Sequence, residues 1–118
     1  MSKATILHIK KSKEFLKGAQ IAQERGLAFP SVTASIFSTT QMGNALAVEY
    51  CQQSFNQKNI KDMPKALKGK IAIPKTKLLI LKQMIEIRDI PFKTISLSRS
   101  ASLLKKAKDF HQWAGAIL

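Results

Sequence analysis

The clearest pattern of apolar and polar positions in the chain lies between Pro74 and Pro91. Apolar side chains recur there at three- and four-residue spacings, while lysine, glutamine and glutamate side chains share the other side of a helical wheel. Pro91 ends this predicted helix, because the residue before a proline is disfavoured in the α conformation. Residues 70–73 and 92–97 alternate apolar and polar positions with a period of two, so the pattern predicts a strand on each side of the helix.

The rest of the chain repeats this order of short β-prone runs and segments with helical spacing. Ser, Thr, Gly and Pro residues lie at the boundaries, where they favour helix caps and turns. The further strands expected are residues 4–9 and 31–37, and the further helices are residues 12–25, 41–55 and 101–114. This alternation predicts an α/β fold, a small single domain of residues 1–118 with a short, mostly parallel sheet flanked by helices. The pattern leaves one alternative open, an all-α helical bundle in which the short apolar runs are the ends of helices.

Charge changes the picture more than overall composition does. Twenty Lys and Arg stand against seven Asp and Glu, which gives a net charge of +13 and a pI of about 10.2. Such a surplus favours a polyanionic partner, most often nucleic acid, although a soluble protein can also simply be basic. Seventeen of the cations are lysines, which bind phosphate as point charges, whereas reading base edges in DNA relies more on the planar guanidinium. We therefore expect contacts to the phosphate backbone with little sequence specificity, made by lysines gathered on one side of the fold.

Two sets of residues are candidates for those contacts. Eight lysines lie within the 25 residues from Lys58 to Lys82, opposed only by Asp62. If the sheet forms, helix starts at its carboxyl edge present free amides to anions, and the turns at residues 10–12, 38–40, 75–76 and 98–100 carry hydroxyls and mostly cations. The predicted nucleic-acid-binding residues are Lys58, Lys61, Lys65, Lys68, Lys70, Lys75, Lys77, Arg99, Lys105 and Lys108. The predicted phosphate-binding helix starts are Lys10, Lys11, Ser12, Thr76, Ser98 and Ser100.

Other chemistry has little support in the sequence. Cys51 is the single cysteine and cannot form an internal disulfide, which favours a reducing compartment. His8 and His111 are too far apart in sequence for a metal-ligand motif, and the seven acids are scattered. We expect no cofactor, no metal and no enzymatic activity. The sequence has no apolar run long enough to cross a bilayer and no signal peptide, so it favours a cytoplasmic protein.

Residues 83–107, QMIEIRDIPFKTISLSRSASLLKKA, resemble the helix, strand and helix near the end of the L7Ae-like ribosomal RNA-binding fold. In that family an Ile-Pro pair precedes the strand and a serine-led helix follows it. The glycine-rich RNA-contacting motif of the family has no counterpart in this chain, so we infer no membership.

Three functions follow from these patterns. The favoured one is a small basic module that contacts the phosphate backbone of RNA or DNA, as a subunit of a larger nucleoprotein assembly. The second is a protein-interaction subunit or inhibitor that docks its basic face on an acidic protein. Its aromatic anchors would be Trp113, Tyr50 and Phe92. The third is a metal-independent nuclease of the toxin type, in which His111, His8 or Arg99 would handle the proton and the phosphate charge.

Overall fold

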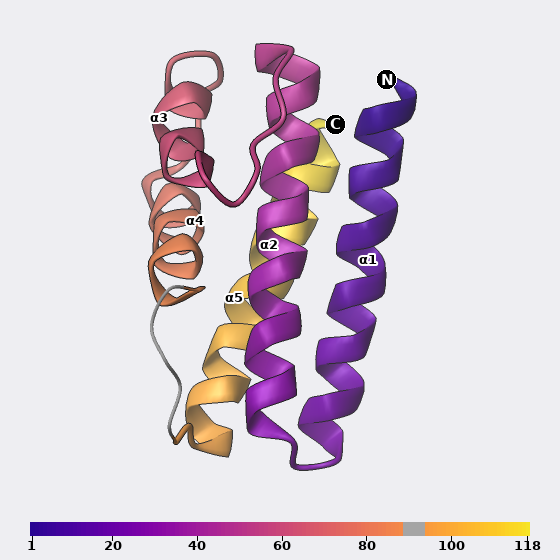
Figure 1. The fold of residues 1–118 in the computed structure, drawn as a ribbon, viewed down its shortest axis with the longest axis vertical. Helices are drawn as coiled ribbons and strands as arrows, with labels where there is room; N and C mark the ends of the chain where they lie inside the picture. Colours follow the sequence, from indigo (N-terminus) through magenta and orange to yellow (C-terminus); the bar gives the residue numbers. More distant parts are fainter. Residues whose placement is uncertain (89–93) are drawn as a thin grey trace.

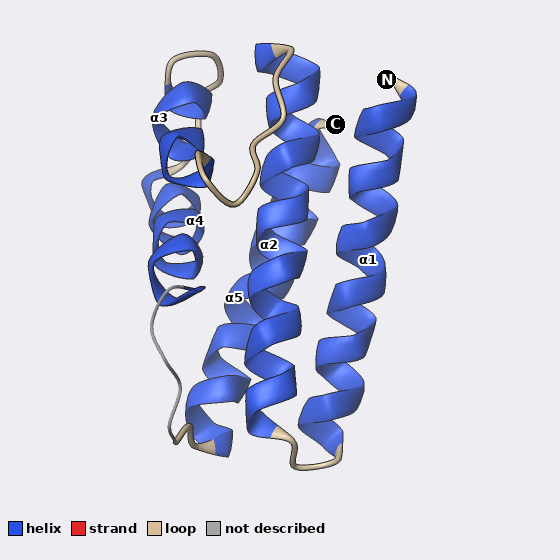
Figure 2. Ribbon diagram, in the orientation of Figure 1, coloured by secondary structure: helices blue, strands red, loops and turns tan. Residues whose placement is uncertain are grey.

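The structure, a computed structural model, describes residues 1–88 and 94–118, and this part of the chain is built from helices without any strand (Figures 1 and 2). The α/β prediction is therefore wrong, and the helical bundle that the pattern left open is correct. The helices are α1 (Lys3–Glu24), α2 (Ala28–Cys51), the short 3-10 helix η1 (Ile60–Asp62), α3 (Met63–Lys68), α4 (Lys75–Arg88) and α5 (Leu97–Ile117).

The two strands predicted in the first half of the chain are both helical. Residues 4–9 lie inside α1. This helix is capped at Ser2, ten residues before the predicted cap at Ser12, and the Ser2 hydroxyl accepts a hydrogen bond from the Thr5 backbone N–H at 3.1 Å. Residues 31–37 lie inside α2, where Ser31 and Ser35 are buried at helical spacing beside Val32 and Ile36. The β-branched content of both runs suggested strands, but packing against neighbouring helices overrides that propensity.

The two later strand predictions fail as well. Residues 70–73 form an irregular connection between α3 and α4. Residues 94–96 are irregular and Leu97 begins α5, so neither the predicted strand nor the strand of the ribosomal resemblance exists there, while residues 92 and 93 lie outside the described part. The predicted helix after Pro74 is confirmed as α4, and the helix predicted over residues 101–114 is confirmed as the larger part of α5.

Helix α2 is the centre of the bundle and contacts α1, α3, α4 and α5. It runs antiparallel to α1 through a tight turn at Gly26, whose φ of +74° lies in the left-handed region that glycine adopts without strain. Helix α5 packs behind α2 in the view of Figure 1, and α3 and α4 lie on the opposite side of α2 from α1. The described part measures 38 × 24 × 23 Å.

The core lies between α2, α4 and α5. As the helical wheels predicted, α4 buries its apolar side except for the exposed Leu79, and α5 buries Leu103, Ala107 and Phe110. Trp113 is half-buried and packs on Phe110, with ring centroids 5.6 Å apart.

Helix α1 is attached to the bundle in a different way. Its fully inward positions are mostly small or polar, with Thr5, Ser12 and Ala19 at seven-residue spacing. The ring pair of Phe15 and Phe37, with centroids 5.3 Å apart, adds a larger contact between α1 and α2, and the partly buried Ile9 and Leu16 pack against the core. The α1 interface therefore buries hydroxyls and methyl groups where the other helices bury leucine, isoleucine and methionine.

Two features fix α3 and α4 against α2. A Cβ atom at Gly43 would lie 2.5 Å from Sδ of Met63 and 3.2 Å from a methyl carbon of Leu81, so the absence of a side chain lets both helices approach α2 closely. The Asn44 side chain accepts a hydrogen bond from the Phe55 N–H at 2.7 Å and donates one to the Phe55 carbonyl at 3.0 Å. Gly43 thus brings α3 and α4 close to α2, and Asn44 holds the connection that leads from α2 to η1.

Candidate anion-binding groove

A groove of about 570 Å³ lies where η1 and α3 meet α4. Its lining combines cationic and apolar side chains with one carboxylate, namely Lys61, Pro64, Lys65, Lys68, Leu78, Lys82, Ile85 and Glu86. The lysines are exposed, whereas the proline, leucine and isoleucine are buried. The groove therefore has an apolar floor beneath a cationic rim, and we refer to it as the basic groove.

Helical spacing explains why these lysines meet. Lys61, Lys65 and Lys68 are separated by four and three residues, which places them on one side of the continuous turn from η1 into α3. Lys82 comes from α4, where Leu78 and Ile85 lie four residues before it and three residues after it and form the floor. The chain returns from α3 to α4 in a short connection, and the Pro74 carbonyl accepts hydrogen bonds from the N–H groups of Lys77 and Leu78 in the first turn of α4.

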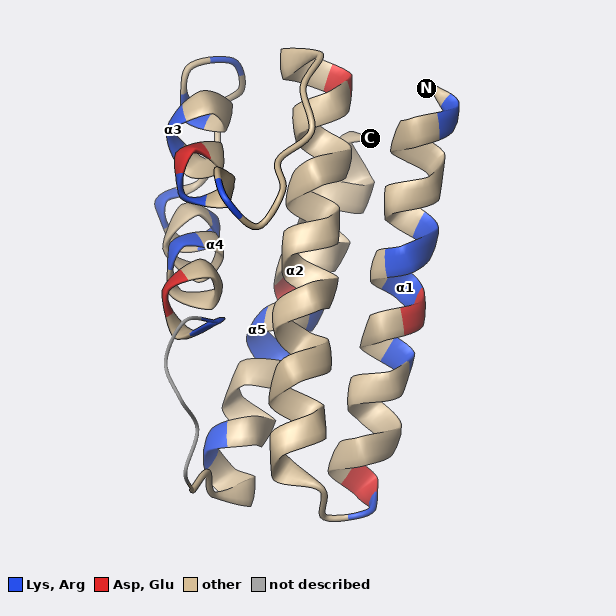
Figure 3. Cartoon of the chain, viewed as in Figure 1, with Lys and Arg blue, Asp and Glu red and all other residues tan. Residues whose placement is uncertain are grey.

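The electrostatics of this region are strongly one-sided. Residues 58–88 carry nine Lys and Arg against two acids, Asp62 and Glu86. Figure 3 shows the resulting concentration of cations over α3 and α4. An anion in the groove would meet several ammonium groups within a Debye length of about 8 Å, so the arrangement suits a chain of phosphates better than a single neutral ligand.

The predicted lysine run is thus brought together only in part. Lys61, Lys65 and Lys68 line the groove, and Lys58, Lys70, Lys75 and Lys77 belong to the same region without lining it. Lys82 lines the groove although the predicted set of binding residues omits it, and its spacing from the apolar residues of α4 was a signal available in the sequence.

The remaining cations do not join the groove. Arg99, Lys105 and Lys108 are exposed on α5, a different helix. The outer edge of α1 carries a further set, while α2 contains no Lys or Arg at all (Figure 3). The expectation that the cations gather on one side of the fold is therefore not met.

The predicted edge of phosphate-binding helix starts does not exist, because it depended on the sheet. Lys10, Lys11 and Ser12 lie in the middle of α1, and residues 38–40 lie buried in the middle of α2. Thr76 does lie exposed in the first turn of α4. In these helix interiors the hydroxyls bond to protein groups, as Ser and Thr within helices often do.

The start of α5 also leaves little room for an anion. The cap is Ser96, whose hydroxyl accepts a hydrogen bond from the Arg99 N–H at 3.0 Å. Ser98 is exposed, but Ser100 is buried, and its hydroxyl is within hydrogen-bond distance of Gln23 Oε1 at 2.7 Å and of the Leu97 carbonyl at 2.9 Å.

A serine and a histidine form a buried pair between α1 and α5. Ser12 Oγ lies 2.8 Å from His111 Nδ1 and donates its proton to the Ser38 carbonyl at 2.8 Å. The direction of the Ser12–His111 hydrogen bond depends on the tautomer of His111, so the short distance by itself does not make His111 a base for a serine nucleophile. Burial, and secondarily the charge of Lys13, lowers the pKa of His111 below its usual value. The pair is a structural hydrogen bond, because Ser12 is inaccessible to a substrate.

The candidate nuclease residues do not assemble into one site. His8 Nδ1 is within hydrogen-bond distance of Gln41 Oε1, at 2.6 Å, a different partner from that of His111. Arg99 precedes His111 by twelve residues in α5, which corresponds to about 18 Å along the axis. Arg99 and His111 are therefore too far apart to act on one phosphate.

The proposed aromatic anchors are not free indole or phenol groups on the surface. Trp113 packs on the core, and the Tyr50 hydroxyl donates to the Ile117 carbonyl at 2.9 Å. Phe92 lies outside the described residues.

Neither a search for metal sites and membrane spans nor comparison with known proteins assigns a function to the chain. Among the described residues, no group of three His, Cys, Asp or Glu side chains is placed to hold a metal ion. No helix in residues 1–88 or 94–118 has both the length and the apolar composition needed to cross a bilayer. No protein-family model matches the chain, and no curated protein is similar to it.

Proposed function

We propose that the protein is a nucleic-acid-binding module that contacts the phosphate backbone through the basic groove. The observation that carries the proposal is the convergence of four lysines from two helical segments, Lys61, Lys65 and Lys68 with Lys82, on one groove. Lysines from separate segments are not required for helix capping or packing. They form a row of point charges that suits successive phosphates.

The groove favours backbone contacts over base recognition. No aromatic side chain lines it, so it lacks the stacking platforms on which single-strand-specific proteins hold bases. It also contains no arginine, the residue most used for bidentate contacts to guanine. Binding should therefore depend strongly on salt and weakly on sequence.

The test is a titration of labelled single- and double-stranded RNA and DNA at about 50 mM and about 200 mM salt, the range over which phosphate-dominated binding weakens most clearly. Lys65→Gln/Lys68→Gln should weaken binding and reduce the slope of log K against log[salt] by about 1.4 to 1.8, since each lost phosphate contact removes about 0.7 to 0.9. The matched control is Lys105→Gln/Lys108→Gln, which removes the same charge from exposed positions on α5. Absence of binding by the wild-type protein at the lower salt refutes the proposal, and equal losses in both double variants refute the groove as its site.

The apolar floor favours a second candidate function, the docking of an acidic amphipathic helix. Pro64, Leu78 and Ile85 would contact its apolar side and the rim lysines its carboxylates. A Glu-rich amphipathic peptide, compared with polyglutamate of the same charge, tests this directly. Preference for the amphipathic peptide, together with no binding to any nucleic acid, would favour this function over the first.

A further inference from the structure

Helix α1 carries a second row of cations. Lys3, Lys10 and Lys17 are exposed and repeat every seven residues, which places them about 10.5 Å apart along one side of the helix. They are offset by two residues from the buried Thr5, Ser12 and Ala19, and two residues correspond to about 200° around a helix. The seven-residue repeat that turns small side chains towards the bundle thus turns lysines away from it. We call this row the α1 edge.

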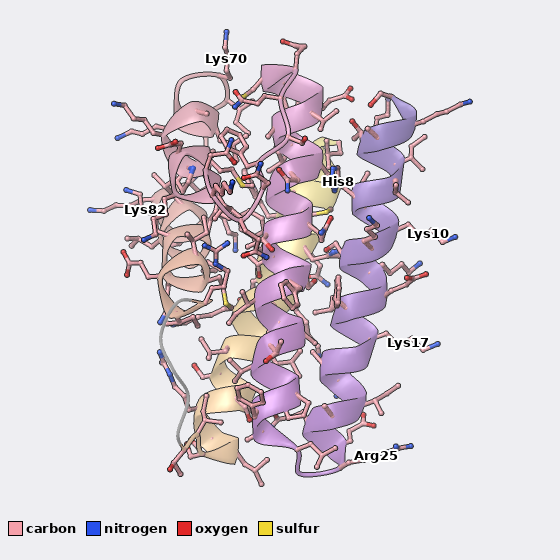
Figure 4. The ribbon with its side chains drawn as sticks, viewed as in Figure 1. His8, Lys10, Lys17, Arg25, Lys70 and Lys82 are labelled. Carbon is pink, nitrogen blue, oxygen red and sulfur yellow. The ribbon has the colours of Figure 1, made fainter. Side chains whose placement is uncertain are left out.

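The α1 edge and the basic groove face in opposite directions. In Figure 4, Lys10 and Lys17 point away from α2 on one side of the molecule, and Lys82 points away from it on the other. Helix α2 lies between them and carries a single charged residue, Glu49. The molecule is 24 Å across in this direction. That width exceeds a Debye length of about 8 to 10 Å, so an anion bound at one side does not neutralise the other.

Each side has enough charge to act by itself. Residues 3–25 carry six Lys and Arg against Glu14 and Glu24, and residues 58–88 carry nine against two. Two cationic surfaces on opposite sides of a small rigid helical body are the arrangement expected for joining two polyanions.

From this geometry we propose that one molecule bridges two nucleic-acid segments, one in the basic groove and one along the α1 edge. The inference rests on the proposed function, because it adds a second binding surface to the first. It assigns a role to Lys3, Lys10 and Lys17, which lie outside the groove.

Helix α5 offers a competing path for a single strand. It lies behind α2 and carries four cations against Asp109, and its Lys106 donates a hydrogen bond to Gln83 of α4 at 2.9 Å. One flexible strand that ran from the groove across α5 to α1 would use both cationic surfaces without bridging. Short rigid duplexes separate the two arrangements, because a duplex of about 20 base pairs lies far below the persistence length of about 150 base pairs and does not bend round a body of this size.

The experiment is a capture assay with two short duplexes, one immobilised on beads and one fluorescent in solution, at about 50 mM salt. Wild-type protein should retain the fluorescent duplex, and retention should fall again when protein is in large excess, because each duplex then binds its own molecules. Lys10→Gln/Lys17→Gln should bind a single duplex within about threefold of wild type but capture the second duplex at least tenfold less well. The control Lys105→Gln/Lys108→Gln should capture it as wild type does.

The outcomes separate the two proposals. A wild-type protein that binds one duplex but never captures a second overturns bridging and leaves the proposed function in place. Capture that survives Lys10→Gln/Lys17→Gln also overturns it, since the second duplex is then held by another surface or by a second copy of the chain. Failure to bind even one duplex overturns both. Circular dichroism of each variant confirms that the exposed substitutions leave the helices intact.

Discussion

Gly43 offers the sharpest test of how the basic groove is built. A methyl group there would lie 2.5 Å from Sδ of Met63 and 3.2 Å from a carbon of Leu81. Both neighbours are fully buried, so neither side chain has open space into which to move. Gly43→Ala should therefore carry an overpacking cost of about 1 to 3 kcal/mol. Removing a glycine from a helix interior offsets about 1 kcal/mol of that cost.

Gly18→Ala is the matched control, because a Cβ atom at Gly18 would meet nothing within 4 Å. Both substitutions replace a glycine in a helix interior, so the gain in helix propensity is common to the pair. The control should be more stable than wild type by about 1 kcal/mol. The difference in unfolding free energy between the two variants isolates the packing cost and should be about 1 to 3 kcal/mol.

The assay is urea unfolding followed by far-ultraviolet circular dichroism, with the two midpoints compared at equal slope. With a slope of about 1 to 2 kcal/mol per molar urea, the midpoints should differ by about 0.5 to 3 M. In a Met63→Ala background the Gly43→Ala cost should shrink, since the smaller side chain vacates the space that the new methyl group needs. If Gly43→Ala is as stabilising as Gly18→Ala, then α3 and α4 do not pack this closely on α2, and the reasoning about the groove fails.

Two further predictions concern polar contacts. Burial and the charge of Lys13 lower the pKa of His111 in the folded protein, so the unfolded chain binds this proton more tightly. The contribution of neutral His111 to the free energy of unfolding should be fully present above the usual histidine pKa of about 6.5. It should be lost as the pH falls through the lower pKa of the folded protein. His111→Gln should flatten this dependence in urea unfolding between pH 5 and pH 8, and an unchanged profile would contradict the assignment. Asn44→Ala should cost about 2 kcal/mol, because it leaves the buried Phe55 N–H and carbonyl without partners. A midpoint for Asn44→Ala equal to that of the wild-type protein would show that the Asn44 contacts contribute nothing.

The sequence predicted the helices whose cores are made of large apolar residues. In α4 the buried positions are leucine, isoleucine and methionine, and in α5 they include Leu103, Leu104 and Phe110; a helical wheel places these residues on one side of each helix. The apolar pattern did not predict the first turns of α1, because the inward positions there are Thr5 and Ser12, while Ile6 and Leu7 lie exposed. An apolar pattern cannot reveal an interface made of hydroxyls and methyl groups.

The first half of α2 was missed for a related reason. Ser31, Ser35 and Ser38 are buried at helical spacing, but serine counts as polar in any such pattern. The wrong sheet then led to the wrong prediction of an anion-binding edge. Of the four helix starts assigned to that edge, residues 10–12 and 38–40 lie inside longer helices, whereas residues 75–76 and 98–100 do lie at the starts of α4 and α5. The groove lysines were partly found, since Lys61, Lys65 and Lys68 are close in sequence, whereas the contribution of Lys82 depends on how α4 packs against α3.

The hydroxyl-lined contact between α1 and the bundle also bears on how the molecule opens. Separating α1 from its neighbours exposes the fully buried threonine, serine and alanine together with the partly buried Ile9, Phe15 and Leu16, while the leucine and methionine core between α2, α4 and α5 stays closed. Amide hydrogens in α1 should therefore exchange with solvent before those of α2.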